Sequence, residues 1–261
     1  MTQVDRIWEV NTWGLRFTMA PEISYIADAL LEGFRGKPNQ LPIVVTPNVD
    51  ILVTLESAKE RVVETVDQAA MVLPDGQPLV SFSRFAGDRI EKRLAGSDLT
   101  MELWPRLVSE QRSVFAVTST TEVAERLVTQ ESSVTALVAP VLPAVDGTLI
   151  DRFAWECIES ISNMATVPEF IFLGIGFPKD VLLARSIVDQ WPSEFGEPPM
   201  VIAVGASLEF LTGLKRRAPE VYQRLGIEFV HRIISDPKRM LKRYFVRDLR
   251  FVLILGRHLF K

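Results

Sequence analysis

The sequence predicts an α/β fold with a largely parallel sheet flanked by helices. Six short apolar runs, rich in β-branched residues, recur along the chain, and each is followed by turn residues. The runs are apolar throughout, which is typical of strands that are buried on both faces. Longer amphipathic stretches separate them, and helices that alternate with such strands cover the two faces of a sheet. The predicted arrangement is therefore Rossmann-like.

Each predicted element corresponds to one stretch of this pattern. The strands are expected within residues 41–48, 70–76, 113–120, 134–141, 169–176 and 199–206. The helices are expected within residues 19–34, 48–66, 120–131, 151–165 and 179–191, where apolar residues recur at helical spacing. From about residue 213 the chain becomes basic and helix-like. We therefore divide it into an α/β core of residues 1–212 and a C-terminal appendage of residues 213–261.

The composition excludes several classes of protein. With 261 residues, 48% of them hydrophobic and 24% charged, the chain can bury a globular core and is not disordered. Its N-terminus has neither a basic start nor an uninterrupted apolar stretch, which argues against a secretory signal. Cys157, the single cysteine, cannot form an intramolecular disulfide, and the two histidines show no zinc-ligand spacing. We expect a cytoplasmic protein without a metal or other cofactor.

Charge is distributed unevenly along the chain. Residues 215–261 hold 13 Lys and Arg against four Asp and Glu, a balance of +9, whereas the rest of the chain carries −13. A basic tail on an acidic body predicts a polyanionic partner, either nucleic acid, a phosphorylated ligand or an anionic membrane surface. No nucleic-acid-binding motif is recognisable, so we expect no nucleic acid partner. The apolar run 251–255 is too short to cross a bilayer but suits the membrane interface.

Polar residues that directly follow predicted strands are candidates for a binding site. Ligands of parallel sheets bind at the carboxyl ends of the strands, where loops and helix N-termini converge. Glycines at these ends, such as Gly176, allow the backbone to approach phosphate oxygens. Neither glycine stretch, 174–179 or 204–207, is a complete phosphate-binding loop. The polar candidates are Thr46, Asn48, Asp75, residues 118–121, Lys179, Asp180, Ser207 and Glu209.

Several short patterns occur in a fixed order along the chain. They are Thr46-x-Asn48, Pro74-Asp75-Gly76, Arg93-x-x-Gly96-x-Asp98-Leu99, Gly174-x-Gly176-x-Pro178-Lys179, Gly205-Ala206, Gly213-x-Lys215-Arg216-x-Ala218-Pro219, Leu225-Gly226-x-Glu228-x-x-x-Arg232 and Asp236-Pro237-x-Arg239. In this ordered set the chain resembles the bacterial WecG/TagA/CpsF family of glycosyltransferases. The resemblance implies transfer of N-acetylmannosamine, its uronic acid or a related hexose from a UDP-sugar to a polyprenyl-diphosphate-linked saccharide. It also implies self-association, so we expect a homo-oligomer.

Asp75 matches the acid that is the proposed catalytic base of the family. Displacement of UDP with inversion requires an acceptor hydroxyl to lose its proton as it attacks, and a carboxylate within hydrogen-bond reach can accept that proton. The alternative is that Pro74-Asp75-Gly76 is only a tight turn, since these residue types favour turns for local reasons. The two hypotheses are compatible, because a tight turn would fix the direction of the carboxylate.

The resemblance assigns further residues to the same pocket. Thr46 and Asn48 match a pair that lines it, although Asn48 could equally be the N-cap of the helix that follows. Arg93 matches an active-site arginine whose planar guanidinium suits a diphosphate, and the alternative is a solvated surface arginine.

Basic residues of the appendage complete the implied scheme. Arg232, Arg239 and, more loosely, Lys242 or Arg243 match cations that the family is thought to fold over the pocket, where they would stabilise the charge growing on the departing UDP. The ordinary alternative is a solvated basic face. With such cations in place of a divalent ion, we predict a metal-independent enzyme that is peripheral on the inner face of the bacterial cell membrane.

The chain departs from the family pattern at three places. Residues 178–181 read PKDV instead of Pro-Lys-Gln-Glu, Glu209 replaces an Asp, and residues 118–119 read TS instead of Gly-Gly. These changes leave the donor sugar open. Our leading hypothesis is an inverting glycosyltransferase of cell-envelope or exopolysaccharide biosynthesis. The alternative is a catalytically altered nucleotide-sugar-binding or scaffold protein of an envelope-assembly complex.

Overall fold

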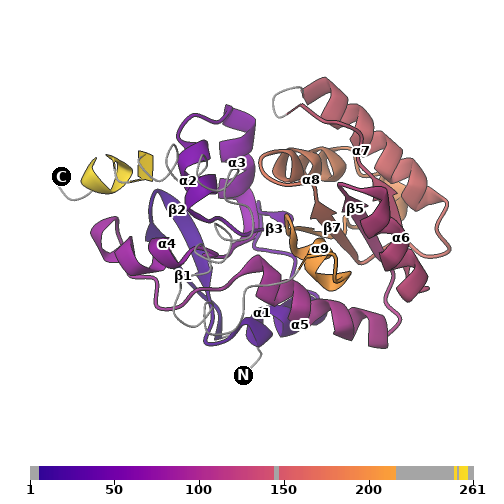
Figure 1. Cartoon of the computed structure of the whole chain (residues 1–261), viewed down its shortest axis with the longest axis horizontal. Helices are drawn as coiled ribbons and strands as arrows, with labels where there is room; N and C mark the ends of the chain where they lie inside the picture. Colours follow the sequence, from indigo (N-terminus) through magenta and orange to yellow (C-terminus); the bar gives the residue numbers. More distant parts are fainter. Residues whose placement is uncertain (1–5, 144–146, 216–249, 252, 258–261) are drawn as a thin grey trace.

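A parallel sheet of six strands forms the centre of the protein. The computed structural model describes residues 6–143, 147–215, 250–251 and 253–257, and Figure 1 shows their arrangement. The strand order is β4-β3-β8-β7-β5-β6, and every pairing within this sheet is parallel. The predicted fold class is therefore confirmed. The strands are β3 (Leu41–Val45), β4 (Ala69–Val72), β5 (Val114–Thr118), β6 (Val134–Val138), β7 (Phe170–Gly174) and β8 (Met200–Ala203).

Helices cover both faces of the sheet because both faces are apolar. In β7, Ile171 and Leu173 pack into one core and Phe170 and Phe172 into the other, and all four side chains are buried. One face is covered by α3 (Glu60–Gln68), α7 (Gly147–Ser162) and α8 (Lys179–Asp189). The opposite face is covered by α1 (Ile23–Leu31), α5 (Gly96–Ser109), α6 (Thr121–Gln130) and α9 (Ser207–Leu211).

An antiparallel hairpin that the sequence did not predict precedes the sheet. Its strands are β1 (Trp8–Thr12) and β2 (Leu15–Met19), and it lies against β4, where the Val72 N–H donates to Thr18 Oγ1 at 3.2 Å. Trp13 and Gly14 form its turn with φ angles of 57° and 71°. The remaining short elements are α2 (Val49–Leu55), α4 (Gln77–Phe82), η2 (Ser83–Phe85) and η3 (Ser193–Phe195).

The stretch predicted as a single helix, residues 48–66, is divided into α2 and α3. Past the end of α2, the N–H groups of Ser57 and Ala58 donate to carbonyls three residues earlier, each at 3.2 Å. Lys59 is extended and is the N-cap residue of α3. The chain therefore tightens and turns between the two helices, and this break brings residues 57–59 to a cavity that is described below.

The end of the chain returns to the body of the protein. Within the apolar run 251–255, Phe251 and Ile254 are buried, whereas 59% of the Leu253 surface is exposed. The Phe251 ring lies 5.3 Å from the ring of Trp13 and 6.4 Å from that of Phe82, measured between centroids. Part of the run expected in a membrane interface thus packs against the hairpin and α4. Residues 216–249 lie outside the described part of the chain, and none of the described helices is long and apolar enough to cross a membrane.

Replacing Phe251 with Ala should lower the free energy of unfolding by about 1–3 kcal/mol. Deleting a buried phenylalanine ring costs about 3–5 kcal/mol in a core, and less here because a terminal segment can detach instead of leaving a cavity. Thermal or urea unfolding measures the change. Leu253→Ala, in the same segment but exposed, is the matched control and should leave stability almost unchanged. Equal effects of the two substitutions would contradict this packing.

Candidate active site

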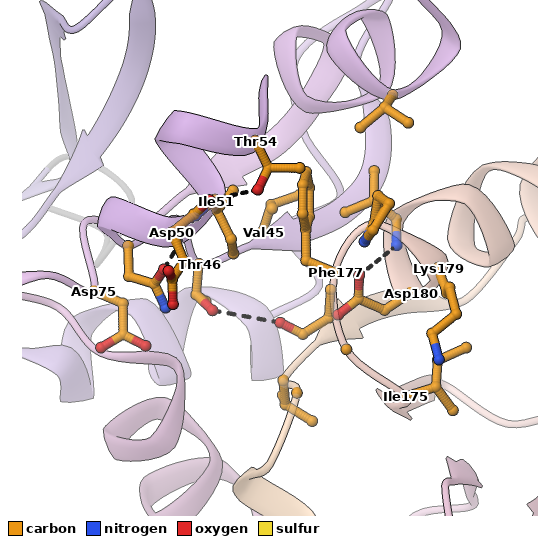
Figure 2. A pocket seen from close by; sticks show the side chains of 18 of the residues that line it. Val45, Thr46, Asp50, Ile51, Thr54, Asp75, Ile175, Phe177, Lys179 and Asp180 are labelled. Carbon is orange, nitrogen blue, oxygen red and sulfur yellow. Dashed lines mark hydrogen bonds between the residues drawn. The ribbon is translucent and has the colours of Figure 1, made fainter. Parts of the chain in front are cut away.

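A cavity of about 700 Å³ opens at the carboxyl ends of the strands. It is lined by the residues that follow β3, β4, β7 and β8, together with parts of α2, α8 and α9. Figure 2 shows Asp75 and Thr46 towards one end of it and Lys179 and Asp180 towards the other. The sheet therefore brings together residues that are more than 100 positions apart in the sequence. This is the location that the parallel sheet predicted.

Thr46 is fixed where β3 ends. Its side chain is buried, and its hydroxyl lies 3.5 Å from the carbonyl oxygen of Ala203, the last residue of the neighbouring β8. The first residue of α5, Gly96, packs directly against it, since a Cβ at Gly96 would lie only 2.7 Å from Thr46 Oγ1. A glycine is required here because any side chain would push the threonine out of position.

Gly96→Ala should accordingly displace Thr46 and lower stability by about 1–3 kcal/mol, the usual range for overpacking a buried site. We also expect slower catalysis, because Thr46 lines the cavity. Gly147→Ala is the matched control: Gly147 is also the first residue of its helix, and its added Cβ would meet nothing closer than Arg61 Nη1 at 4.0 Å. Thermal unfolding and an activity assay measure both variants. Similar losses in the two would show that the contact with Thr46 is not the cause.

Asn48 is the N-cap residue of α2. Its Oδ1 accepts a hydrogen bond from the Ile51 N–H at 3.2 Å, so the capping hypothesis is confirmed. The residue is half-buried and also lines the cavity. Because Oδ1 is engaged in the cap, the amide nitrogen Nδ2 is the side-chain atom of Asn48 that a ligand would use. Its role in substrate binding stays a prediction.

Asp75 lines the cavity from the link between β4 and α4. Its N–H donates to the Pro47 carbonyl oxygen at 2.9 Å, and the Leu73 N–H donates to Val45 O at 2.8 Å. The segment therefore continues beside the end of β3 in an extended form until α4 begins at Gln77. The expected tight turn is wrong, because hydrogen bonds to the neighbouring segment replace those of a local turn. The same bonds hold Asp75 at the cavity.

Arg93 lies next to the segment that links β4 to α4 and carries Asp75. The N–H of its neighbour Leu94 donates to Pro74 O at 2.9 Å, and Arg93 pairs with Asp98 at the start of α5, with 3.6 Å between Nη2 and Oδ2. Only 15% of its side chain is exposed, so the alternative of a solvated surface arginine is wrong. Among the described residues, however, Arg93 does not line the cavity. Contact with a substrate stays a prediction.

The loop from β7 to α8 forms the opposite wall of the cavity. Gly176 adopts a left-handed φ of 80°, which favours glycine, and it lines the cavity together with Lys179 and Asp180, the first two residues of α8. The positive end of the helix dipole and the Lys179 ammonium both favour a bound anion at this wall.

Asp180 is the most deeply buried carboxyl group of the cavity lining. Its surface is 4% exposed, and burial raises the pKa of its carboxyl group from the ordinary value of 3.8 to about 7. A hydrogen bond from the Val181 N–H to Oδ1, at 2.8 Å, and the charge of Lys179 oppose this rise. Near neutral pH, Asp180 is therefore partly protonated.

Not every predicted residue reaches the cavity. Glu209 forms an ion pair with Lys215, and its side chain is 19% exposed. On the same short helix, Ser207 and Phe210 line the cavity instead. Within the described chain, Glu209 is therefore not placed to bind a substrate there, because α9 directs its side chain towards Lys215. The predicted residues Arg232, Arg239 and Arg243 lie outside the described residues.

Five polar residues of the lining were missed by sequence reasoning, and two of them are Thr54 in α2 and Ser57 after it. Asp50 belongs to the first turn of α2, Lys59 precedes α3, and Ser97 is the second residue of α5. Ser97 lies inside the pattern that begins at Arg93, which was the one available signal. Asp50 and Lys59 fall within the stretch predicted as a continuous helix, so nothing marked them. Over the described residues, no group of three or more His, Cys, Asp or Glu side chains could hold a metal ion.

Comparison with known proteins identifies the family of this chain. The sequence model of the glycosyl transferase WecG/TagA/CpsF family matches residues 10–261. The chain belongs to this family. Its resemblance to the WecG/TagA/CpsF glycosyltransferases, inferred above from short patterns, is therefore confirmed.

Curated relatives from this comparison carry a more specific name. One, from Staphylococcus aureus strain MRSA252, is 28% identical over 199 residues, which cover 76% of this chain and 73% of the relative. A second, from strain MW2 of the same species, is 27% identical over 197 residues, with 76% and 73% covered. Both are named N-acetylglucosaminyldiphosphoundecaprenol N-acetyl-beta-D-mannosaminyltransferase.

Proposed function

We propose that this WecG/TagA/CpsF protein is an inverting glycosyltransferase that moves a hexose or N-acetylhexosamine from a UDP-sugar to a polyprenyl-diphosphate-linked saccharide. The observation that carries the proposal is the position of Asp75 in a cavity whose opposite wall is the amino end of α8. The relatives are named for the transfer of N-acetylmannosamine to a lipid-linked N-acetylglucosamine, and these names support the same class of acceptor.

In the proposed reaction, the two walls of the cavity have different roles. Asp75 accepts the proton of the acceptor hydroxyl while the hydroxyl oxygen attacks the anomeric carbon. The bond between that carbon and the diphosphate oxygen breaks, UDP leaves, and the proton remains on Asp75. Lys179 and the amino end of α8 attract the diphosphate, and Arg232, Arg239 and Arg243 of the appendage add positive charge. We propose that this positive charge replaces a divalent metal ion.

The basic appendage is proposed to hold the protein at the inner face of the cell membrane, where a polyprenyl-linked acceptor resides. Among the described residues 250–257, Arg250, Leu253 and Arg257 recur at helical spacing and are exposed, and Arg257 also pairs with Glu56, with 3.2 Å between Nη1 and Oε1. Basic and apolar side chains on one helix face suit the surface of an anionic bilayer.

Incubation with a panel of UDP-sugars and a polyprenyl-diphosphate-linked N-acetylglucosamine acceptor tests the proposal. We expect one donor to give a glycosylated lipid of inverted anomeric configuration, with activity that persists in excess EDTA. UDP-sugar binding without transfer from any donor would favour the alternative of a catalytically altered binding or scaffold protein. The specific reason to keep that alternative is Asp180, a buried acid where the family pattern has Gln.

A further inference from the structure

Asp180 occupies an unusual place for a carboxyl group. It is the second residue of α8, it lines the cavity, and it is 4% exposed. The apolar side chains of Ile175, Val181 and Leu182 line the same region and are buried. Figure 2 shows Asp180 beside Phe177 on the wall opposite Asp75. A charged carboxylate in such surroundings is costly unless a cation or several donors compensate it.

That compensation is weak in the described part of the chain. Oδ1 accepts one hydrogen bond from another residue, the Val181 N–H at 2.8 Å. The N–H of Asp180 itself donates to Gly176 O at 3.2 Å, and it also lowers the pKa of the carboxyl group. No ion pair joins Lys179 to Asp180 among the described residues, although the charge of Lys179 acts on the carboxyl from the adjacent position. The second carboxyl oxygen is therefore the atom that can carry a proton and donate it to a ligand.

Among the described residues, other charged groups near α8 do not form an ion pair with Asp180. On the cavity side they are Asp50, Lys59 and Asp75, at the ends of neighbouring elements. Where α3 and α7 pack against α8, the charged groups pair with one another along the helix and away from its amino end. These pairs are Arg61 with Asp151, Arg61 with Asp189, and Arg185 with Asp189.

We propose that Asp180 binds the nucleotide sugar as a neutral carboxylic acid whose hydroxyl donates a hydrogen bond to an anionic oxygen of the ligand. The inference rests on the proposed function. The amino end of α8 and Lys179 draw an oxyanion to this wall. A protonated Asp180 completes its binding, whereas an ionised Asp180 repels it. The oxyanion belongs either to the diphosphate or to the carboxylate of a uronic acid sugar.

Proton-linked binding distinguishes this chain from one with an amide at the same position. The Gln of the family pattern donates a hydrogen bond at any pH, but Asp180 donates one only while it is protonated. Affinity for the ligand therefore falls as the pH rises and the acid ionises. With ionisation near neutral pH, the affinity should fall about tenfold between about pH 6 and pH 8.

Isothermal titration calorimetry of the full chain tests this, with UDP-N-acetylmannosamine and the corresponding UDP-uronic acid as ligands. The diphosphate of a UDP-sugar keeps its charge over this pH range, so the protein alone titrates. We expect the wild type to bind about tenfold more weakly at about pH 8 than at about pH 6. Asp180→Asn, which cannot ionise, should bind with nearly the same affinity at both values. Glu122→Gln is the matched control, because Glu122 is the exposed second residue of α6. It should retain the wild-type pH dependence.

The two ligands separate the two sources of the oxyanion. A pH dependence with both ligands identifies the diphosphate, and a dependence with the uronic acid alone identifies the sugar carboxylate. The inference is overturned if wild type and Asp180→Asn share one pH profile, or if wild-type affinity is the same at both pH values. Absence of binding of both ligands by the wild type at both pH values would overturn this inference, and the proposed function would fall with it only if no donor of the UDP-sugar panel gives transfer.

Discussion

Asp75→Asn should lower the rate of sugar transfer by about 100- to 10,000-fold, the usual contribution of a positioned general base. The amide has nearly the same shape as the carboxylate but cannot accept the proton of the acceptor hydroxyl. The backbone around it should be unchanged, because the residue is held by its own N–H to Pro47 and by the Leu94 N–H to Pro74. The loss should therefore appear in kcat more than in donor affinity.

The measurement is the initial rate of glycosyl transfer with saturating donor and lipid acceptor. Donor affinity, measured separately, shows that the variant still binds. Asp67→Asn is the control: Asp67 is an exposed residue of α3 that does not line the cavity. It should retain full activity. Undiminished turnover in Asp75→Asn would remove the assigned base, and the reaction would then need another proton acceptor.

Asp180→Asn should stabilise the protein at neutral and alkaline pH but not in acid. Burial raises the pKa of the folded-state carboxyl from 3.8 to about 7. Below the lower value, both folded and unfolded chains are protonated, and the group has no pH-dependent effect. Between the two values the unfolded chain ionises first, so the wild type loses stability as the pH rises. At 1.36 kcal/mol per pKa unit, the loss approaches about 4 kcal/mol above pH 7.

Thermal or urea unfolding at about pH 4 and pH 8 measures this difference. The stability gained by Asp180→Asn over the wild type should be small at the lower pH and large at the higher one. The amide can retain the bond from the Val181 N–H, since its oxygen also accepts. Glu122→Gln changes an exposed acid at the same helical position, so its effect should vary little with pH. A pH-independent effect of Asp180→Asn would mean that the carboxyl is ionised in the folded protein.

The candidate site could be predicted in part because polar residues after parallel strands converge. Thr46, Asn48, Asp75, Lys179 and Asp180 all line the cavity. Those positions are fixed by where each strand ends, which the apolar runs reveal. Site residues in helices, or at breaks between helices, were not found from the strand ends, because packing decides where their side chains point. Glu209 was assigned to the site and instead pairs with Lys215, and Lys59 lines the cavity without any local signal.

By itself, the sequence determined the six sheet strands and the family. The strands could be recognised in the sequence because burial on both faces requires apolar side chains at every position. The hairpin was not, since its strands mix polar with apolar residues and its turn places Trp13 in a left-handed conformation that the residue type does not favour. Only the tertiary structure decided the strand order, the break between α2 and α3, and the packing of Phe251 on Trp13. The burial that shifts the pKa of Asp180 was decided there too. Apart from the break between α2 and α3, whose hydrogen bonds are local, these features arise from contacts between distant segments, which no local pattern of residues encodes.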